Sequence, residues 1–362
     1  MFSTTELLIA FFISFITTLL LVYPVRKIAI KLGIMDAPDY RKIHKVVTPR
    51  LGGLAIFLGA LTGAIYLGPN HDYLLEITIG AIVIVVTGLL DDKYQLRPVV
   101  KLLGQLLAAG CLLYGGLIIE RINVPLLGLV ELNTTVSILI TTLWIIGIAN
   151  AINLIDGLDG LASGISAIAL TSILIMAIAD QRVVVIYLCV ILIGSNIGFL
   201  FHNFHPAKIY MGDTGSMFLG YMIAVISILG LFKNVTLFSF VIPVIVLAIP
   251  IFDTLFSIIR RANKGTGIMM PDKQHLHHQL LAAGLSHRNT VLLLYGFSMT
   301  FGVLAILFSG ASIGLSLIIT LIVLFLLQMF AEFVGIVGKG KMPVLRYSKR
   351  LIKKVTNRST QS

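Results

Sequence analysis

The sequence predicts an all-α, polytopic integral membrane protein with about eleven transmembrane helices. Hydrophobic residues make up 57% of its 362 residues and charged residues only 12%, and the mean hydropathy of +1.00 excludes an ordinary soluble domain. Apolar stretches of about 20 residues, the length that a helix needs to cross a bilayer, recur along the chain. The expected spans are residues 5–24, 52–68, 77–90, 99–119, 136–152, 160–179, 183–201, 216–232, 236–258, 291–310 and 313–334.

Lysine and arginine residues indicate the orientation of these spans. If the N-terminus lies outside, 24 of the 27 basic residues fall on the inner side, and only Arg121, Arg182 and Lys233 fall outside. Such a bias sets orientation by the positive-inside rule, and it places the C-terminus in the cytoplasm. The net charge of +11 therefore reflects membrane topology, and no nucleic-acid partner is expected.

The same pattern predicts one transmembrane domain over residues 1–338 and a basic cytoplasmic tail over residues 339–362. Basic tails of this kind are typically attracted to lipid surfaces. Five stretches connect the spans on the inner side. These expected cytoplasmic loops are residues 25–51, 91–98, 153–159, 202–215 and 260–290.

Acidic residues recur at the ends of spans on this inner side. Carboxylates beside hydrocarbon are costly, so they are candidates for function. Oxygen ligands with few thiols or imidazoles among them indicate a hard cation such as Mg²⁺, and Mg²⁺ in turn indicates phosphate chemistry. The acids concerned are Asp91 and Asp92 after the third span, Asp156 and Asp159 after the fifth, and Asp213 after the seventh.

The spacing within the segment 150–160, Asn-Ala-Ile-Asn-Leu-Ile-Asp-Gly-Leu-Asp-Gly, sharpens this prediction. Asn153 and Asp156 are three residues apart and therefore share a face of a helix. Two glycines are expected to end that helix, which could bring Asp159 back toward the site. Capping of a helix end is the alternative interpretation of Asp156 and Asp159.

The pair Asp91 and Asp92 allows two interpretations as well. Adjacent helical residues point about 100° apart, so only one of the two is expected to face a substrate directly. The pair could instead mark a solvated helix end. Asp253 is a further acid, expected roughly 10 Å up a helix from the inner boundary at Arg260.

Glycines and cations complete the candidate site. Two glycines flank Asp213 in residues 211–216, which would let backbone N–H groups and the carboxylate approach one anionic ligand, although a short turn is the alternative. Lys45 and Arg50 provide cations beside another glycine turn.

Three histidines lie in the longest expected inner loop. Phosphate contact is favoured over zinc binding because no cysteine is near and Mg²⁺ prefers oxygen ligands. A structural or solvated cluster is the alternative. The histidines are His275, His277 and His278.

Together these motifs resemble the polyprenyl-phosphate N-acetylhexosamine-1-phosphate transferases, which form glycosyltransferase family 4. Four motifs carry the resemblance in order, and it covers nearly the whole chain. The chain is most similar to the GlcNAc-1-phosphate branch, which includes enzymes that initiate wall teichoic acid synthesis. The motifs are Asp91-Asp92, residues 150–160, residues 203–216 (NFHPAKIYMGDTGS) and His275-x-His277-His278.

The resemblance implies a reaction and a location. UDP-GlcNAc and undecaprenyl phosphate would give undecaprenyl-diphospho-GlcNAc and UMP, with Mg²⁺ as cofactor and Mn²⁺ as its alternative. The implied location is the plasma membrane of a bacterium, with the active site on the cytoplasmic face of a multi-pass protein. A homodimer is left open.

Residue roles follow by matching positions. The resemblance implies that Asp213 binds the metal, that Asn153 is a second contact to the metal or diphosphate, and that the ring of Tyr210 stacks on uracil. The expected catalytic acids are Asp91, Asp92, Asp156 and Asp159. The expected substrate contacts are Lys45, Arg50, Lys101, Asn203, Tyr210, His275, His277 and His278.

Two other functions are weighed against this one. The phospho-MurNAc-pentapeptide translocase of peptidoglycan synthesis is a rival within the family, but it carries three consecutive histidines, which Leu276 interrupts here. A cation-coupled lipid or sugar transporter is a rival from another class. Transporter sites cluster near the bilayer midplane, whereas these acids lie at one interface.

Overall fold

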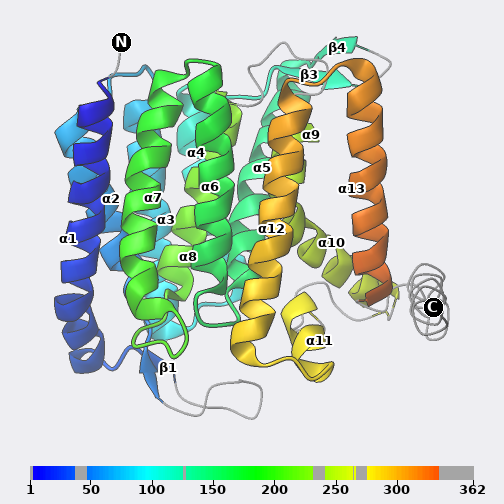
Figure 1. Cartoon of the computed structure of the whole chain (residues 1–362). Coiled ribbons are helices and arrows are strands. Elements are labelled where there is room, and N and C mark those ends of the chain that lie inside the picture. Colours follow the sequence, from blue (N-terminus) through cyan, green and yellow to red (C-terminus); the bar gives the residue numbers. More distant parts are fainter. Residues whose placement is uncertain are drawn as a thin grey trace.

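A computed structural model describes residues 3–36, 47–124, 128–230, 241–263, 265 and 275–333. These residues form a helical bundle, so the all-α prediction is confirmed (Figure 1). The helices are α1 Thr4–Lys31, α2 Gly52–Leu67, α3 Leu74–Tyr94, α4 Pro98–Tyr114, α5 Thr134–Ile155, α6 Leu161–Ala179, α7 Val183–Asn203, α8 Gly212–Gly230, α9 Val241–Val246, α10 Ala248–Asn263, α11 Leu276–Ala282, α12 His287–Ser309 and α13 Ile313–Phe333.

Two small antiparallel sheets lie at opposite ends of the bundle (Figure 1). In the first, β1 (Met35–Asp36) pairs with β2 (Thr48–Pro49), and Asp36 faces Thr48 in the register. In the second, β3 (Arg121–Val124) pairs with β4 (Gly128–Glu131), and Arg121 faces Glu131. The sheets are loop structures on a helical protein and do not change its class.

Eight of the described helices are long and apolar enough to cross a membrane: α1, α3, α5, α6, α7, α8, α12 and α13. The apolar helices α2 and α4 are shorter. These ten helices coincide with ten of the eleven expected spans, which makes the chain a multi-pass membrane protein. The full count of eleven and the sidedness of the termini stay predictions, and the expected tail 339–362 lies outside the described residues.

The expected span 236–258 is not a single helix where the structure describes it. Residues 241–246 form α9, and the helix is interrupted at Leu247 before α10 begins. Pro250 explains the break, because proline has no N–H to donate to the carbonyl of Val246 and its ring clashes with that carbonyl. In Figure 1, α10 accordingly runs obliquely away from α9.

Helix α8 is the centre of the bundle, and all of its residues are buried. Glycines on two neighbouring helices, α2 and α3, let these helices approach its backbone closely. A Cβ added at Gly53 of α2 would lie 2.0 Å from the Gly215 nitrogen, and one added at Gly88 of α3 would lie 2.4 Å from Thr214 Cα. The first turn of α8, which carries Asp213, is therefore enclosed by protein.

The helices alternate in direction, so the connections that carry the predicted site share one end of the bundle. The ends of α3, α5 and α7 and the starts of α2, α4, α6, α8 and α12 all lie at the lower end in Figure 1, together with α11. The β3–β4 hairpin lies at the opposite end. This arrangement brings motifs together that are more than a hundred residues apart in the sequence.

Candidate active site

Asp213, in the first turn of α8, is held between two cations. Arg50, just before α2, contacts Asp213 Oδ1 through Nη2, and Lys101 of α4 contacts Asp213 Oδ2 through Nζ. The Asp213 residue is 5% exposed, and the two basic side chains are partly exposed. Both oxygens of the Asp213 carboxylate are therefore paired with a basic side chain.

Asp92, near the end of α3, anchors the start of α8. Its Oδ1 accepts a hydrogen bond from the Asp213 N–H at 2.8 Å, and its Oδ2 accepts from the Thr214 N–H at 3.0 Å and the Thr214 hydroxyl at 2.6 Å. The Arg50 Nε lies 3.0 Å from Asp92 Oδ1. The first N–H groups of a helix lack partners within the helix and favour a negative charge, so this fully buried carboxylate caps α8 from outside.

Asp91 points to a different set of partners from its neighbour, as the 100° helical step predicts. Its Oδ1 accepts from the Leu96 N–H at 2.8 Å, which stabilises the turn between α3 and α4. Its Oδ2 lies 3.1 Å from the Lys101 Nζ. Lys101 therefore bridges Asp91 and Asp213, and Asp91 helps to hold this cation.

The segment 153–160 brings a second group of polar side chains to the start of α8. Helix α5 ends at Ile155, and Gly160 adopts a left-handed φ of 77° in the turn that follows. The Asn153 side-chain amide donates to Ser216 Oγ at 2.8 Å. Burial raises the pKa of Asp156 to about 7, and the nearby charges of Asp213 and Asp92 add to this rise while Arg50 opposes it.

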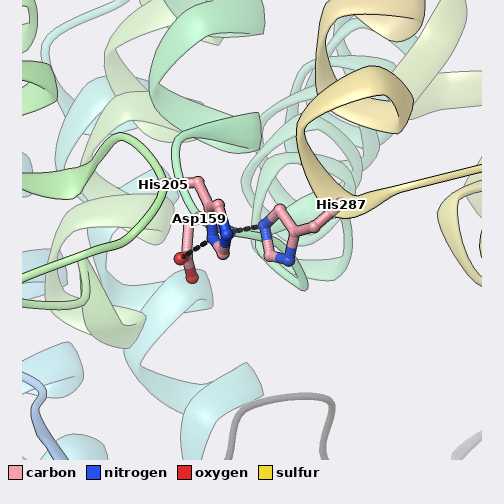
Figure 2. A group of neighbouring side chains, drawn as sticks. All are labelled: Asp159, His205 and His287. Atoms are coloured by element: carbon pink, nitrogen blue, oxygen red, sulfur yellow. Dashed lines mark hydrogen bonds and ion pairs between the residues drawn. The ribbon is translucent and has the colours of Figure 1, made fainter.

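Asp159 is part of a hydrogen-bonded group with two histidines (Figure 2). Its Oδ2 lies 2.8 Å from His205 Nδ1 and accepts from the Ala207 N–H at 3.1 Å. Its own N–H donates to His287 Nε2 at 3.0 Å, and the rings of His205 and His287 stack with centroids 4.2 Å apart. The group therefore links the 156–160 turn, the 204–211 loop and α12.

These three side chains also have the spacing of metal ligands. Their candidate ligand atoms lie within 4.8 Å of one another. However, the Asp159 Oδ2 and the His287 Nε2 already accept hydrogen bonds from other groups, so a metal ion would have to displace them. The hydroxyl of Tyr295 also donates to the Gly160 carbonyl, so α12 and the turn are held together by a further hydrogen bond. This favours a structural role for the group.

Asn203 fastens the same turn from α7. Its Oδ1 accepts from the Gly160 N–H and the Ser163 hydroxyl, both at 3.1 Å, and its Nδ2 donates to the Ile209 carbonyl at 3.0 Å. The residue is 2% exposed. A direct contact between Asn203 and a nucleoside, which stays a prediction, would have to replace one of these bonds.

Tyr210 lies beside Arg50, where the chain before α2 runs parallel to the chain before α8. The Tyr210 N–H donates to the Pro49 carbonyl at 2.8 Å, and the Gly52 N–H donates to the Tyr210 carbonyl at 2.9 Å. Burial raises the pKa of Tyr210 to about 12, so its phenol stays protonated. The residue is half-buried, which leaves part of it accessible for stacking.

The histidine motif reaches the turn through His277 of α11. A Cβ added at Gly157 would lie 2.4 Å from His277 Nε2, so the imidazole packs against the backbone of the turn. His277 is 2% exposed, and neither ring nitrogen has a hydrogen-bond partner among the described residues. Burial lowers the pKa of His277 to about 3, so its imidazole is neutral. Buried nitrogens without a partner among the described residues require an explanation, and a bound ligand would provide one.

The structure thus brings most predicted residues to one end of the bundle, whereas Lys45 lies outside the described residues. Sequence reasoning did not single out four residues that hold the site together: Thr214, His205, His287 and Tyr295. The first two lie inside recognised motifs, which is the signal that could have found them. His287 and Tyr295 lie far along the chain from the turn that they contact and belong to no motif.

Comparison with known proteins places this site in a family. The sequence model of Glycosyl transferase family 4 matches residues 74–231, from the start of α3 to just beyond the end of α8. A Bacillus subtilis (strain 168) protein named probable undecaprenyl-phosphate N-acetylglucosaminyl 1-phosphate transferase is 48% identical over 350 residues, which cover 96% of this chain and 98% of that protein.

More distant relatives have related names. The decaprenyl-phosphate N-acetylglucosaminephosphotransferase of Mycobacterium tuberculosis (strain H37Rv) is 37% identical over 75% of each chain. The undecaprenyl-phosphate alpha-N-acetylglucosaminyl 1-phosphate transferase of Yersinia pestis is 27% identical over 80% of each chain. This multi-pass protein belongs to the polyprenyl-phosphate N-acetylhexosamine-1-phosphate transferases of glycosyltransferase family 4.

Proposed function

We propose that this protein transfers GlcNAc-1-phosphate from UDP-GlcNAc to undecaprenyl phosphate, giving undecaprenyl-diphospho-GlcNAc and UMP. The observation that carries the proposal is the site around Asp213, where three acids, Asp91, Asp92 and Asp213, meet Arg50 and Lys101 at the enclosed start of α8. The near full-length similarity to the Bacillus subtilis protein, whose name states the same lipid and sugar, supports it.

Phosphoryl transfer needs positioning and charge neutralisation more than covalent help from the protein. In the proposed reaction, an oxygen of the lipid phosphate attacks the phosphorus that bears GlcNAc, and the bond from that phosphorus to the UMP oxygen breaks. The lipid phosphate is mostly dianionic at pH 7, by analogy with a phosphoserine pKa near 6, and needs little help from a base. Arg50 and Lys101 are suited to bind substrate phosphates, but because Asp91, Asp92 and Asp213 already pair with them, the proposed reaction needs further positive charge.

The residues present also fit Mg²⁺, or Mn²⁺ as its alternative. Carboxylate and amide oxygens from Asp213, Asn153 and Asp156 are ligands of the kind that hard cations prefer. Burial, with a smaller contribution from Asp213 and Asp92, raises the pKa of Asp156, and a divalent cation beside these acids would favour their ionised forms. We propose that Asp213 and Asn153 hold the metal, which would help to neutralise the diphosphate.

The other side chains suit the two ends of the nucleotide-sugar. The half-buried Tyr210 offers a ring for stacking on uracil. The ring nitrogens of His277, which have no hydrogen-bond partner among the described residues, suit a phosphate oxygen or a water bound to it. The bias of basic residues supports an active site on the cytoplasmic face of a bacterial plasma membrane. Supply of wall teichoic acid synthesis is proposed from the resemblance alone.

Substrate choice tests the proposal. Purified protein in detergent, with undecaprenyl phosphate and Mg²⁺, is offered UDP-GlcNAc, UDP-GalNAc or UDP-MurNAc-pentapeptide, and the lipid products are identified by mass spectrometry. We expect UMP release and a GlcNAc-bearing lipid with UDP-GlcNAc, and no turnover after chelation of the metal. A MurNAc-pentapeptide lipid would favour the translocase, and no UMP with any donor would favour a transporter.

A further inference from the structure

Asp253 of α10 is a buried carboxylate whose two oxygens bind two consecutive residues of another segment. Its Oδ2 lies 2.9 Å from His275 Nδ1, and its Oδ1 accepts from the Leu276 N–H at 2.8 Å. The side chains of Asp253 and His275 are only 3% and 6% exposed. Burying a carboxylate in a membrane protein costs free energy unless the carboxylate is paired and hydrogen-bonded, as Asp253 is here. A buried acid of this kind is therefore a candidate for function.

This contact sets the start of α11. His275 precedes the first residue of α11, and its own side chain does not cap the helix. The Asp253 carboxylate instead accepts the N–H of Leu276 from a different helix, so it fixes where α11 begins. An ionised carboxylate also requires that His275 Nδ1 carry the proton, which leaves His275 Nε2 for another partner.

The start of α11 in turn places His277 of the histidine motif against the 156–160 turn. The rings of His275 and His277 are nearly parallel, with an interplanar angle of 5° and centroids 5.9 Å apart. His277 packs on Gly157, which directly follows Asp156. A shift at Asp253 would therefore move the histidines relative to the residues that we propose bind the diphosphate.

We propose that Asp253 is a positioning residue for the reaction: it orients His275 and holds α11 so that the histidine motif faces the diphosphate of the nucleotide-sugar. This inference rests on the proposed function. It differs from a purely structural role because it predicts a specific coupling between Asp253 and His275. In metal sites, mutating a carboxylate that accepts the second ring N–H of a ligating histidine lowers metal affinity or activity by about 10- to 100-fold. A loss of similar size is expected here.

The first test is Asp253→Asn, which keeps the shape and one oxygen for the Leu276 N–H but loses the charge that fixes His275. We expect kcat/KM for UDP-GlcNAc to fall about 10- to 100-fold, with the KM for undecaprenyl phosphate and the melting temperature in detergent unchanged. Asp253→Glu keeps the charge and should retain more activity than Asp253→Asn. The control is Thr254→Val on the same helix, because the Thr254 hydroxyl has no partner in the described part of the chain.

The decisive test is a double-mutant cycle with His275→Ala. If Asp253 acts through His275, adding Asp253→Asn to His275→Ala should lower kcat/KM by less than about twofold. Independent, multiplying losses would overturn the inference, as would wild-type turnover by Asp253→Asn or unfolding of both Asp253 variants. Failure of the wild-type protein to release UMP from UDP-GlcNAc would instead overturn the proposed function itself.

Discussion

Asp92 is the single residue on which the geometry of the site depends most directly. Sequence reasoning placed it among the catalytic acids without distinguishing it from Asp91, because adjacent carboxylates look alike in a motif. The structure separates them, since Asp92 bonds to the start of α8 while Asp91 bonds to Lys101. With Arg50 and three hydrogen-bond donors around its two oxygens, Asp92 is suited to position Asp213 more than to accept a proton.

We therefore expect Asp92→Asn to lower kcat by about 100-fold or more and to destabilise the protein by about 3 kcal/mol. An asparagine has only one acceptor oxygen, so its amide would face a backbone N–H with another donor. If the carboxylate acts by holding the helix and not as a base, the fold loss in kcat should be the same at pH 6 and pH 8.5. A loss confined to low pH would show that Asp92 is a base.

A matched control is the exposed ion pair between Arg121 and Glu131 at the opposite end of the bundle. Its side chains are 60% and 73% exposed, so Glu131→Gln is expected to change stability by less than about 1 kcal/mol and to leave turnover unaffected. Melting temperatures and initial rates of UMP release, measured on both variants in one detergent, make the comparison.

Tyr210 provides a test of the nucleotide end of the site. Tyr210→Ala is expected to raise the KM for UDP-GlcNAc by about 5- to 160-fold, because base–aromatic stacking is worth about 1–3 kcal/mol in nucleic-acid sites. Tyr210→Phe keeps the ring face and should stay near the wild-type KM. Equal increases in KM for both variants would assign the effect to the hydroxyl and contradict stacking.

At the scale of the element, α8 works because small residues let its neighbours approach its backbone. A Cβ at Gly53 would lie 2.2 Å from Gly215 Cα, which no rotamer change can relieve since both atoms belong to the main chain. The sequence shows these glycines only as parts of motifs, and their contact joins residues 162 positions apart. Only the structure shows that these glycines allow two helix backbones to come into contact.

Gly53→Ala is expected to prevent accumulation of folded protein, or to lower its stability by about 3 kcal/mol or more, because overpacking at a backbone contact forces the helices apart. Gly110→Ala on α4 is the control, since nothing lies within 4 Å of its added Cβ. Size-exclusion profiles and melting curves of the two variants give the measurement. Equal behaviour of both would contradict the close approach of α2 and α8.

The break between α9 and α10 marks a limit of prediction from hydropathy. Apolar composition over residues 236–258 predicts one continuous span. Hydropathy reports how apolar a segment is, and it carries no information on whether the helical hydrogen bonds of that segment are complete. Pro250 was the available signal for the interruption at Leu247. The break bears on the proposed positioning role of Asp253, because α10 carries Asp253, which contacts His275.

For the whole molecule, the sequence predicts the helical bundle and the meeting of the motifs at one end of it, because hydropathy, basic residues and acidic motifs each act over one span or one loop. Contacts that depend on the three-dimensional path could not be predicted. The hydrogen bond between Asp159 and His287 joins positions 128 residues apart. Tyr295, which donates a hydrogen bond to the Gly160 carbonyl, belongs to no recognised motif. The motifs that meet at this end were therefore mostly predictable, whereas the contacts that orient their side chains were not.

Topology is the prediction that belongs to this scale. In a background without Cys111 and Cys189, Ser286→Cys is expected to react with a membrane-impermeant maleimide only after cells are permeabilised, because the bias of basic residues places the loop before α12 inside. Asn70→Cys, at the opposite end of the bundle, should react in intact cells. Labelling of Ser286→Cys in intact cells would reverse the assigned orientation.

The central claim is direct transfer between the two substrates at the site around Asp213, without a sugar phosphate bound to the protein. It is tested most directly by mixing stoichiometric enzyme with UDP-GlcNAc labelled in its β-phosphate and following UMP release with and without undecaprenyl phosphate. We predict UMP release only with the lipid, with all label recovered in the lipid product, and no release by Asp213→Asn under either condition. A stoichiometric burst of UMP without lipid, with the label retained on the protein, would contradict the account.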